Sequence, residues 1–171
     1  LNGLTIGALY DDFTNANETA RFIWAVDRGL PSPVSAIGKG YRSVITPDLF
    51  YYGGREFIRG KFDGKIDWVE SLREPGCLSA APYGTGDADG CAFSFGTSDA
   101  AAQITHEAAK CHDVLNQVFL AETGSNIPVE ATAILLKAML THGASWEPIA
   151  EKLALAMGAS QKQLSKWLGN G

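Results

Sequence analysis

The stretch FSFGTSDAAAQITH, residues 93–106, places a serine hydroxyl where it can act chemically. If the chain turns at Gly96 and enters a helix at Ser98, unpaired backbone N–H groups and the helix dipole surround that hydroxyl. This setting suits a nucleophile in acyl transfer, because a negative oxygen develops beside the attacking serine. The same residues also fit a serine N-cap on a helix whose alanines, residues 100–102, pack closely against a sheet.

A serine hydroxyl is a weak nucleophile without a base, and the chain contains three histidines. His106 follows Ser98 by eight residues, which on one helix is about 12 Å and too far for a hydrogen bond. His112 lies further along the same segment, and His142 ends another one. We therefore expect these histidines to be packed or solvated, and the base to come from elsewhere.

The first half of the chain, which must position Ser98, has the composition of strands and loops. Three short apolar runs predict strands: 4–9, 43–54 and 90–98. Pro47 argues against one long central strand in the second of them. Residues 17–27 fit either a short helix or an irregular segment. Two stretches are rich in turn residues: 29–40 and 59–90.

The second half has the patterns of helices. Four segments show helical spacing of apolar residues or helix-stop signals: 99–120, 129–143, 146–158 and 161–168. Ser160 and Gln163 form a capping-box pair for the last of them. We therefore predict an α/β fold as a single unit, residues 1–171, with a strand-and-loop half at 1–98 and a helical half at 99–171.

Composition limits the classes of function. Hydrophobic residues make up 46% of the chain and charged residues 19%, as in a folded globular domain. The net charge of −5, without a basic stripe, argues against nucleic-acid binding, and no apolar run is long enough to cross a membrane. Three widely spaced cysteines indicate a reducing compartment, the cytoplasm, and suggest neither a disulfide framework nor a zinc site. Because Leu1 leads directly into a strand-like run, we expect a mature product or a piece of a longer protein.

The segment around Ser98 resembles the nucleophile segment of the subtilisin-like serine peptidases, in a divergent bacterial form. That family has Gly-Thr-Ser, an apolar residue and two small residues, followed by Pro-His-Val. The triplet Gly96-Thr97-Ser98, the small pair and the β-branched Ile104 fit this pattern. Four positions depart from it: Asp99, Ala102, Gln103 and His106.

Further segments resemble the same family in the order that it requires. They are LTIGAL (4–9), SPVSAIGKG (32–40), ITPDLFYYGG (45–54), LLKAMLTHGAS (135–145) and LGNG (168–171). The resemblance covers nearly the whole chain. It implies the C-terminal portion of a subtilisin-like catalytic domain, with a mainly parallel sheet flanked by helices.

The resemblance implies a serine endopeptidase in which Ser98 is the nucleophile and Gly96 and Thr97 form the turn that presents it. The backbone N–H of Ser98 would be one oxyanion donor. In that family the triad runs Asp, His, Ser, and the first two members precede the strand at 4–9, as does an oxyanion-hole asparagine. The implied partners are therefore an N-terminal portion of the same peptidase and a peptide or protein substrate. The resemblance implies no cofactor or metal, and little activity of this chain alone.

Two other functions stay open. One is a non-catalytic α/β binding module, because residues 146–168 resemble a helix-turn-helix with Ala154, Gly158 and Leu164 at its turn. Its groove-facing side chains would be Lys162, Gln163 and Lys166. An ordinary pair of antiparallel helices needs the same small and apolar residues. The other is an inactive peptidase-like scaffold, in which the Asp99 carboxylate repels a developing oxyanion.

For two pairs of aspartates, we expect an ordinary surface position and not a functional site. Asp87 and Asp89 resemble the start of a calcium loop, but the remaining ligands are missing, so we expect a surface turn. Asp11 and Asp12 follow a strand, and we expect both to be solvated.

The aromatic run Phe50, Tyr51 and Tyr52 fits either a substrate groove or packing in the core. We expect Cys77 and Cys91 to be small buried side chains, because neither has an obvious partner that would make it a nucleophile.

Overall fold

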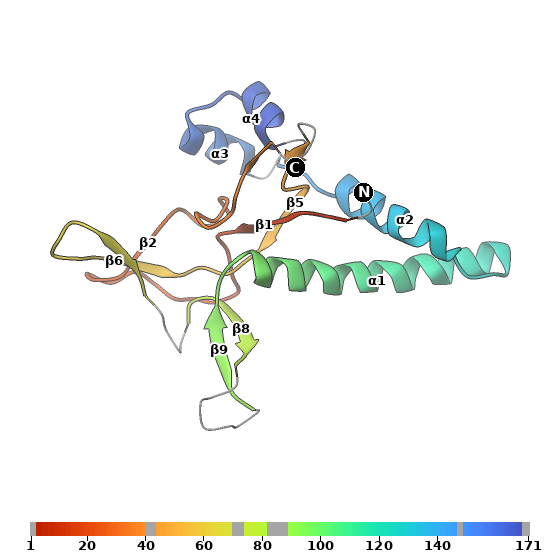
Figure 1. Ribbon diagram of the computed structural model, residues 1–171, viewed down its shortest axis with the longest axis horizontal. Helices are drawn as coiled ribbons and strands as arrows, with labels where there is room; N and C mark the ends of the chain where they lie inside the picture. Colours follow the sequence, from red (N-terminus) through yellow and green to blue (C-terminus); the bar gives the residue numbers. More distant parts are fainter. Residues whose placement is uncertain (1–2, 40–43, 70–73, 82–88, 147–148, 169–171) are drawn as a thin grey trace. The chain divides into compact units, whose positions relative to one another are not determined.

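The computed structural model describes residues 3–39, 44–69, 74–81, 89–146 and 149–168, in which strands precede helices along the chain (Figure 1). The fold is therefore of the mixed α/β class. The chain divides into two compact units. One consists of Leu1–Ile6, Ile37–Phe50 and Ala101–Gly171, and the other of Gly7–Ala36 and Tyr51–Ala100. We call them the helical unit and the strand unit.

The strands expected at 4–9 and 43–54 pair with each other. Strand β1 (Ile6–Leu9) pairs with β5 (Leu49–Tyr52). The N–H of Leu49 donates to the carbonyl of Thr5 at 3.3 Å, and the N–H of Gly53 donates to that of Leu9 at 3.0 Å. Both strands advance in the same direction along these hydrogen bonds, so the pair is parallel.

The other strand pairs are antiparallel. The strand unit holds a sheet of β2 (Ile23–Trp24), β6 (Phe57–Gly60) and β7 (Ile66–Trp68), and a hairpin of β8 (Cys77–Ala80) and β9 (Cys91–Ser94). In the helical unit β3 (Gly38–Lys39) pairs with β4 (Ile45–Thr46). The expectation of a mainly parallel sheet is thus not met in the described residues, because short connections join most of these strands as antiparallel neighbours.

Strands β7 and β8, and the second half of β6, fall in the stretch 59–90, where turn residues predicted loops. These strands are short and include polar or flexible residues such as Arg59, Gly60 and Asp67, so they lack an apolar run. Pairing with a partner strand stabilises them instead. Residues 17–27, left open between helix and irregular structure, contain only the two-residue strand β2.

The four helices lie where the sequence predicts them: α1 (Thr97–Thr123), α2 (Val129–His142), α3 (Ala150–Met157) and α4 (Gln161–Leu168). Gly158 ends α3 in the left-handed conformation, with φ of 60°. The N–H of Ser160 donates to Oε1 of Gln163 at 2.8 Å, which is one half of the expected capping box before α4. The N–H of Gln163 donates to the carbonyl of Ser160 at 2.9 Å and not to the serine hydroxyl. In the described part of the chain, every helix is too short or too polar to cross a membrane.

In the helical unit, Asp48 ties three distant segments together. Its Oδ2 accepts hydrogen bonds from the N–H and the hydroxyl of Thr5, each at 2.8 Å, and Nζ of Lys137 lies 3.6 Å from Oδ1. Burial raises the pKa of Asp48, but these partners outweigh burial and hold that pKa below its ordinary value. Nearby, the rings of Phe50 and Trp146 meet edge to face at 5.1 Å.

In the strand unit, Gly53 marks a close approach between backbones. A Cβ at Gly53 would lie 2.3 Å from the Cβ of Ala8 and 2.9 Å from the carbonyl oxygen of Gly96. Ala8 is fully buried, so its methyl group cannot move outward into solvent to make room. The position just after β5 therefore accepts no side chain without a shift of backbone.

We expect Gly53→Ala to lower the free energy of unfolding of the full-length protein by about 1–3 kcal/mol, because the added methyl group overpacks this contact. Gly60→Ala is the matched control, since a Cβ there has nothing within 4 Å, and we expect it to change stability by less than about 0.5 kcal/mol. Denaturant unfolding measures both variants. Equal stability of the two would contradict the close approach at Gly53.

Candidate functional site: the turn before helix α1

The turn between β9 and α1 has the strand, glycine and helix order that the sequence predicts. After β9, the chain passes through Phe95 to Gly96, which has φ of 148°, a conformation that favours glycine. The N–H of Gly96 donates to the carbonyl of Gly53 at 2.7 Å, and the carbonyl of Gly96 accepts from the N–H of Ala100 at 3.3 Å. Gly96 thus anchors the turn to the end of β5 and opens α1.

Ser98 lies in the first turn of α1 and is exposed. Its hydroxyl has no hydrogen-bond partner among the described residues. Since Ala100 makes the first hydrogen bond of the helix, the N–H groups of residues 97–99 have no partner within α1. The site therefore combines an accessible hydroxyl with backbone donors and the positive end of a helix dipole.

Asp99 is the residue whose carboxylate motivates the inactive-scaffold alternative. That carboxylate accepts hydrogen bonds from two serines. Its Oδ1 lies 2.8 Å from the hydroxyl of Ser94 and 3.0 Å from that of Ser79. The two serine hydroxyls are 2.9 Å apart. The carboxylate is thus held by the β8–β9 hairpin, and its negative charge is partly satisfied by hydroxyl donors.

The structure brings no histidine to Ser98 within the described residues. His106 is exposed on α1, and His142 is exposed at the last position of α2. Nδ1 of His112 lies 3.4 Å from Oδ1 of its neighbour Asp113. Among the described residues, therefore, no imidazole contacts the hydroxyl of Ser98.

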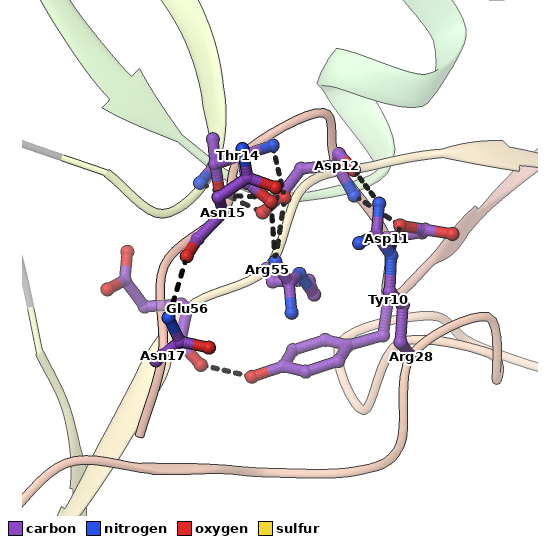
Figure 2. Close-up of polar contacts among 10 residues, drawn as sticks. Tyr10, Asp11, Asp12, Thr14, Asn15, Asn17, Arg28, Arg55 and Glu56 are labelled. Atoms are coloured by element: carbon purple, nitrogen blue, oxygen red, sulfur yellow. Dashed lines mark hydrogen bonds and ion pairs between the residues drawn. The ribbon is translucent and has the colours of Figure 1, made fainter. Parts of the chain in front are cut away.

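The sequence prediction for Asp12 is wrong, because this residue is buried with 2% of its surface exposed. Figure 2 shows its carboxylate converging with Thr14 and Arg55. Oδ1 accepts from the N–H and hydroxyl of Thr14, at 2.9 and 2.8 Å, and from Arg55 at 3.0 Å. Oδ2 accepts from the N–H of Gly76 at 3.1 Å. The neighbouring Asp11, half-buried, pairs with Arg28.

Aromatic side chains complete this buried cluster. The guanidinium carbon of Arg55 lies 4.2 Å from the ring centroid of Trp24, whose ring stacks on Phe57 at 4.1 Å. Tyr10 is fully buried, and its hydroxyl donates to the carbonyl of Glu56. Burial raises the pKa of Tyr10, and its backbone hydrogen bonds offset this only in part.

The remaining residues singled out by the sequence lie outside this site. Asp87 falls outside the described residues, and no group of three His, Cys, Asp or Glu side chains in the described part could hold a metal ion. The ring of Tyr52 contacts those of Tyr51 and Phe13, at 5.2 and 5.3 Å. Cys91 is exposed rather than buried, because it begins the β9 edge of the hairpin, and Cys77 is half-buried.

The helix-turn-helix alternative stays a prediction. In the helical unit α3 and α4 join through Gly158, and Leu164 is buried, as an ordinary helix pair also requires. Lys162, Gln163 and Lys166 are exposed, and the amide of Gln163 caps its own helix.

No protein-family model matches this chain, and comparisons with characterised proteins and with solved structures find no match. The resemblance to subtilisin-like peptidases therefore rests on the sequence motifs alone.

Burial alone raises the pKa of Asp12, but the hydrogen bonds from Arg55 and Thr14 outweigh it and hold that pKa below its ordinary value. The ionised form therefore stabilises the fold above the ordinary carboxyl pKa. This contribution is lost as the pH falls through the lower pKa of the folded state.

We expect Asp12→Asn to destabilise the full-length protein by about 3 kcal/mol at neutral pH, since it leaves a buried guanidinium without its counter-charge. The difference from the wild type should shrink as the pH falls below about 4. Unfolding curves across pH measure this effect. Asp113→Asn, an exposed acid on α1, is the control. A difference independent of pH would contradict an ionised Asp12.

Proposed function

We propose that this chain carries the nucleophile of a serine endopeptidase, with Ser98 as that nucleophile. The supporting observation is the exposed Ser98 hydroxyl in the first turn of α1, directly after a strand and a glycine turn. Gly96 and Thr97 form the turn that presents it. Ser98 is the second residue of α1, and its hydroxyl makes no hydrogen bond among the described residues, which disfavours the alternative in which it only caps the helix.

In the proposed reaction, Ser98 Oγ attacks the carbonyl carbon of the scissile peptide bond while a base removes its proton. The carbonyl oxygen becomes negative and accepts a hydrogen bond from the backbone N–H of Ser98. Return of the proton to the leaving amine breaks the C–N bond and leaves an acyl-enzyme. Water then attacks the ester, and the acid product leaves as Ser98 regains its proton.

The subtilisin-like character of the fold is part of this proposal. It is supported by the parallel pairing of β1 with β5, two of the segments that carry the resemblance. It is supported as well by the hydrogen bond from Gly96 to Gly53, which joins the nucleophile turn to the end of the second segment. The antiparallel hairpins would then be additions around a parallel pair.

The base and its orienting carboxylate come, in this proposal, from an N-terminal portion of the same peptidase. Exposed apolar side chains in the helical unit support a missing neighbour of this kind. They lie on α1 and α2: Val114, Val118, Leu120, Val129, Ile134 and Met139. The three free cysteines suit the reducing cytoplasm as the site of action.

The hydrogen bonds of Asp99 favour an active enzyme over the inactive scaffold. Two hydroxyl donors hold its carboxylate against the β8–β9 hairpin. An acid in the first turn also interacts favourably with the helix dipole, so Asp99 can be accommodated there at little cost.

A fluorophosphonate probe tests the proposal on the full-length protein, because it labels activated serines and the labelled residue can be mapped by mass spectrometry. We expect labelling at Ser98. Ser98→Ala should abolish labelling and lower peptidase activity by more than about 10³-fold. Ser125→Ala, in an exposed loop after α1, should retain both. A folded protein that is unlabelled, or labelled elsewhere, would contradict the assignment.

A further inference from the structure

Two serines and one aspartate form a polar cluster next to Ser98 that the proposed reaction does not use. In the β8–β9 register, Cys77 lies opposite Ser94 and Ser79 lies opposite Ala92. Side chains alternate along strands, so these four residues share one face of the hairpin. The hydroxyls of Ser79 and Ser94 on that face both reach Oδ1 of Asp99, at 3.0 and 2.8 Å.

Asp99 is the dominant acceptor for these hydroxyls. The carbonyl oxygen of Cys77 lies 3.5 Å from each of them, which is long for a hydroxyl hydrogen bond. Ser79 and Ser94 are 2.9 Å apart, but each has one proton to give. The Asp99 carboxylate can accept a hydrogen bond from both hydroxyls at once. If one serine accepts from the other instead, only one of the two hydroxyls can donate to Asp99. The charge of Asp99 therefore favours the arrangement in which both hydroxyls point at it.

This contact fixes how the first turn of α1 is rotated. Successive residues of an α-helix are about 100° apart around its axis. With Asp99 directed at the hairpin, the preceding residue Ser98 is turned away from it, in agreement with its exposure. Ala100, the next residue, is fully buried. At the start of the helix, Ser98 therefore faces solvent, Asp99 faces the hairpin and Ala100 faces the interior.

We propose that Asp99 is a positioning residue, which docks the start of α1 on the β8–β9 hairpin through Ser79 and Ser94 and thereby sets the direction of the Ser98 hydroxyl. The effect of Asp99 on catalysis rests on the proposed function of Ser98. The docking of the helix start on the hairpin does not depend on that function. The residue that departs from the family pattern is in this view the residue that orients the nucleophile.

The experiment compares four variants of the full-length protein: Asp99→Ala, Asp99→Asn, Ser79→Ala/Ser94→Ala, and the triple alanine combination. Asp113→Asn is the control, because it removes an exposed acid from the same helix. The rate constant and end point of fluorophosphonate labelling, kcat and KM for a peptide substrate, and amide hydrogen exchange of residues 95–100 are measured for each.

We expect Asp99→Ala to slow labelling and to lower kcat by about 10- to 100-fold, because a small misplacement of a nucleophile has effects of this size. KM and the labelling end point should stay unchanged, which a mere loss of folded protein would not produce. The double serine variant should show the same loss, and the triple variant no more, since one contact is removed in each case. Asp99→Asn, which keeps an acceptor oxygen, should recover part of the rate.

Unchanged rate constants in Asp99→Ala, or additive losses in the triple variant, would overturn the positioning role while leaving Ser98 as nucleophile. If the wild-type protein is not labelled at Ser98, the proposed function fails, and amide exchange then decides the docking. Faster exchange of the hydrogen-bonded amides of Gly96 and Ala100 in Asp99→Ala than in Asp113→Asn supports the docking, and equal exchange overturns it.

Discussion

The candidate site depends on a close approach of backbones that only glycine permits. Gly53, at the end of β5, leaves room for the buried Ala8 and accepts the N–H of Gly96 at 2.7 Å. Gly54 and Gly76 have positive φ, and a Cβ on either would lie 2.8 or 2.7 Å from the carbonyl oxygen of Ser94. Three glycines from two segments thus enclose the turn that leads to Ser98. A backbone so closely held can present a side chain in one direction without a long strand behind it.

A buried charge, the carboxylate of Asp12, holds two of the backbone segments that form this glycine packing. Asp12 accepts from Gly76, whose backbone adjoins Ser94, and from Arg55, which follows Gly54 in sequence. The strand unit has short strands and many irregular segments, so fewer of its backbone groups are paired in ladders. A carboxylate with four hydrogen bonds can satisfy such groups, and its removal leaves them unpaired. The same cluster therefore links stability of the strand unit to the geometry of the turn.

Local signals in the sequence predicted the helices and the turn at Gly96, because small residues, caps and helical spacing act within one or two turns. They did not predict β7 and β8, whose residues become strands only through pairing with other strands. They also failed for Asp12, since its partner Arg55 is 43 residues away and an acid after a strand is usually solvated. Asp99 was noticed as a departure from a pattern, but its partners Ser79 and Ser94 became visible only with the hairpin register.

The central claim is that the start of α1 presents Ser98 as a nucleophile beside backbone donors for the oxyanion. A crystal structure of the full-length protein after reaction with a fluorophosphonate tests it most directly. The account predicts phosphorus bonded to Oγ of Ser98, with a phosphoryl oxygen about 3 Å from the backbone N–H of Ser98. An adduct on another residue, or one whose phosphoryl oxygen points away from the helix start, would contradict it.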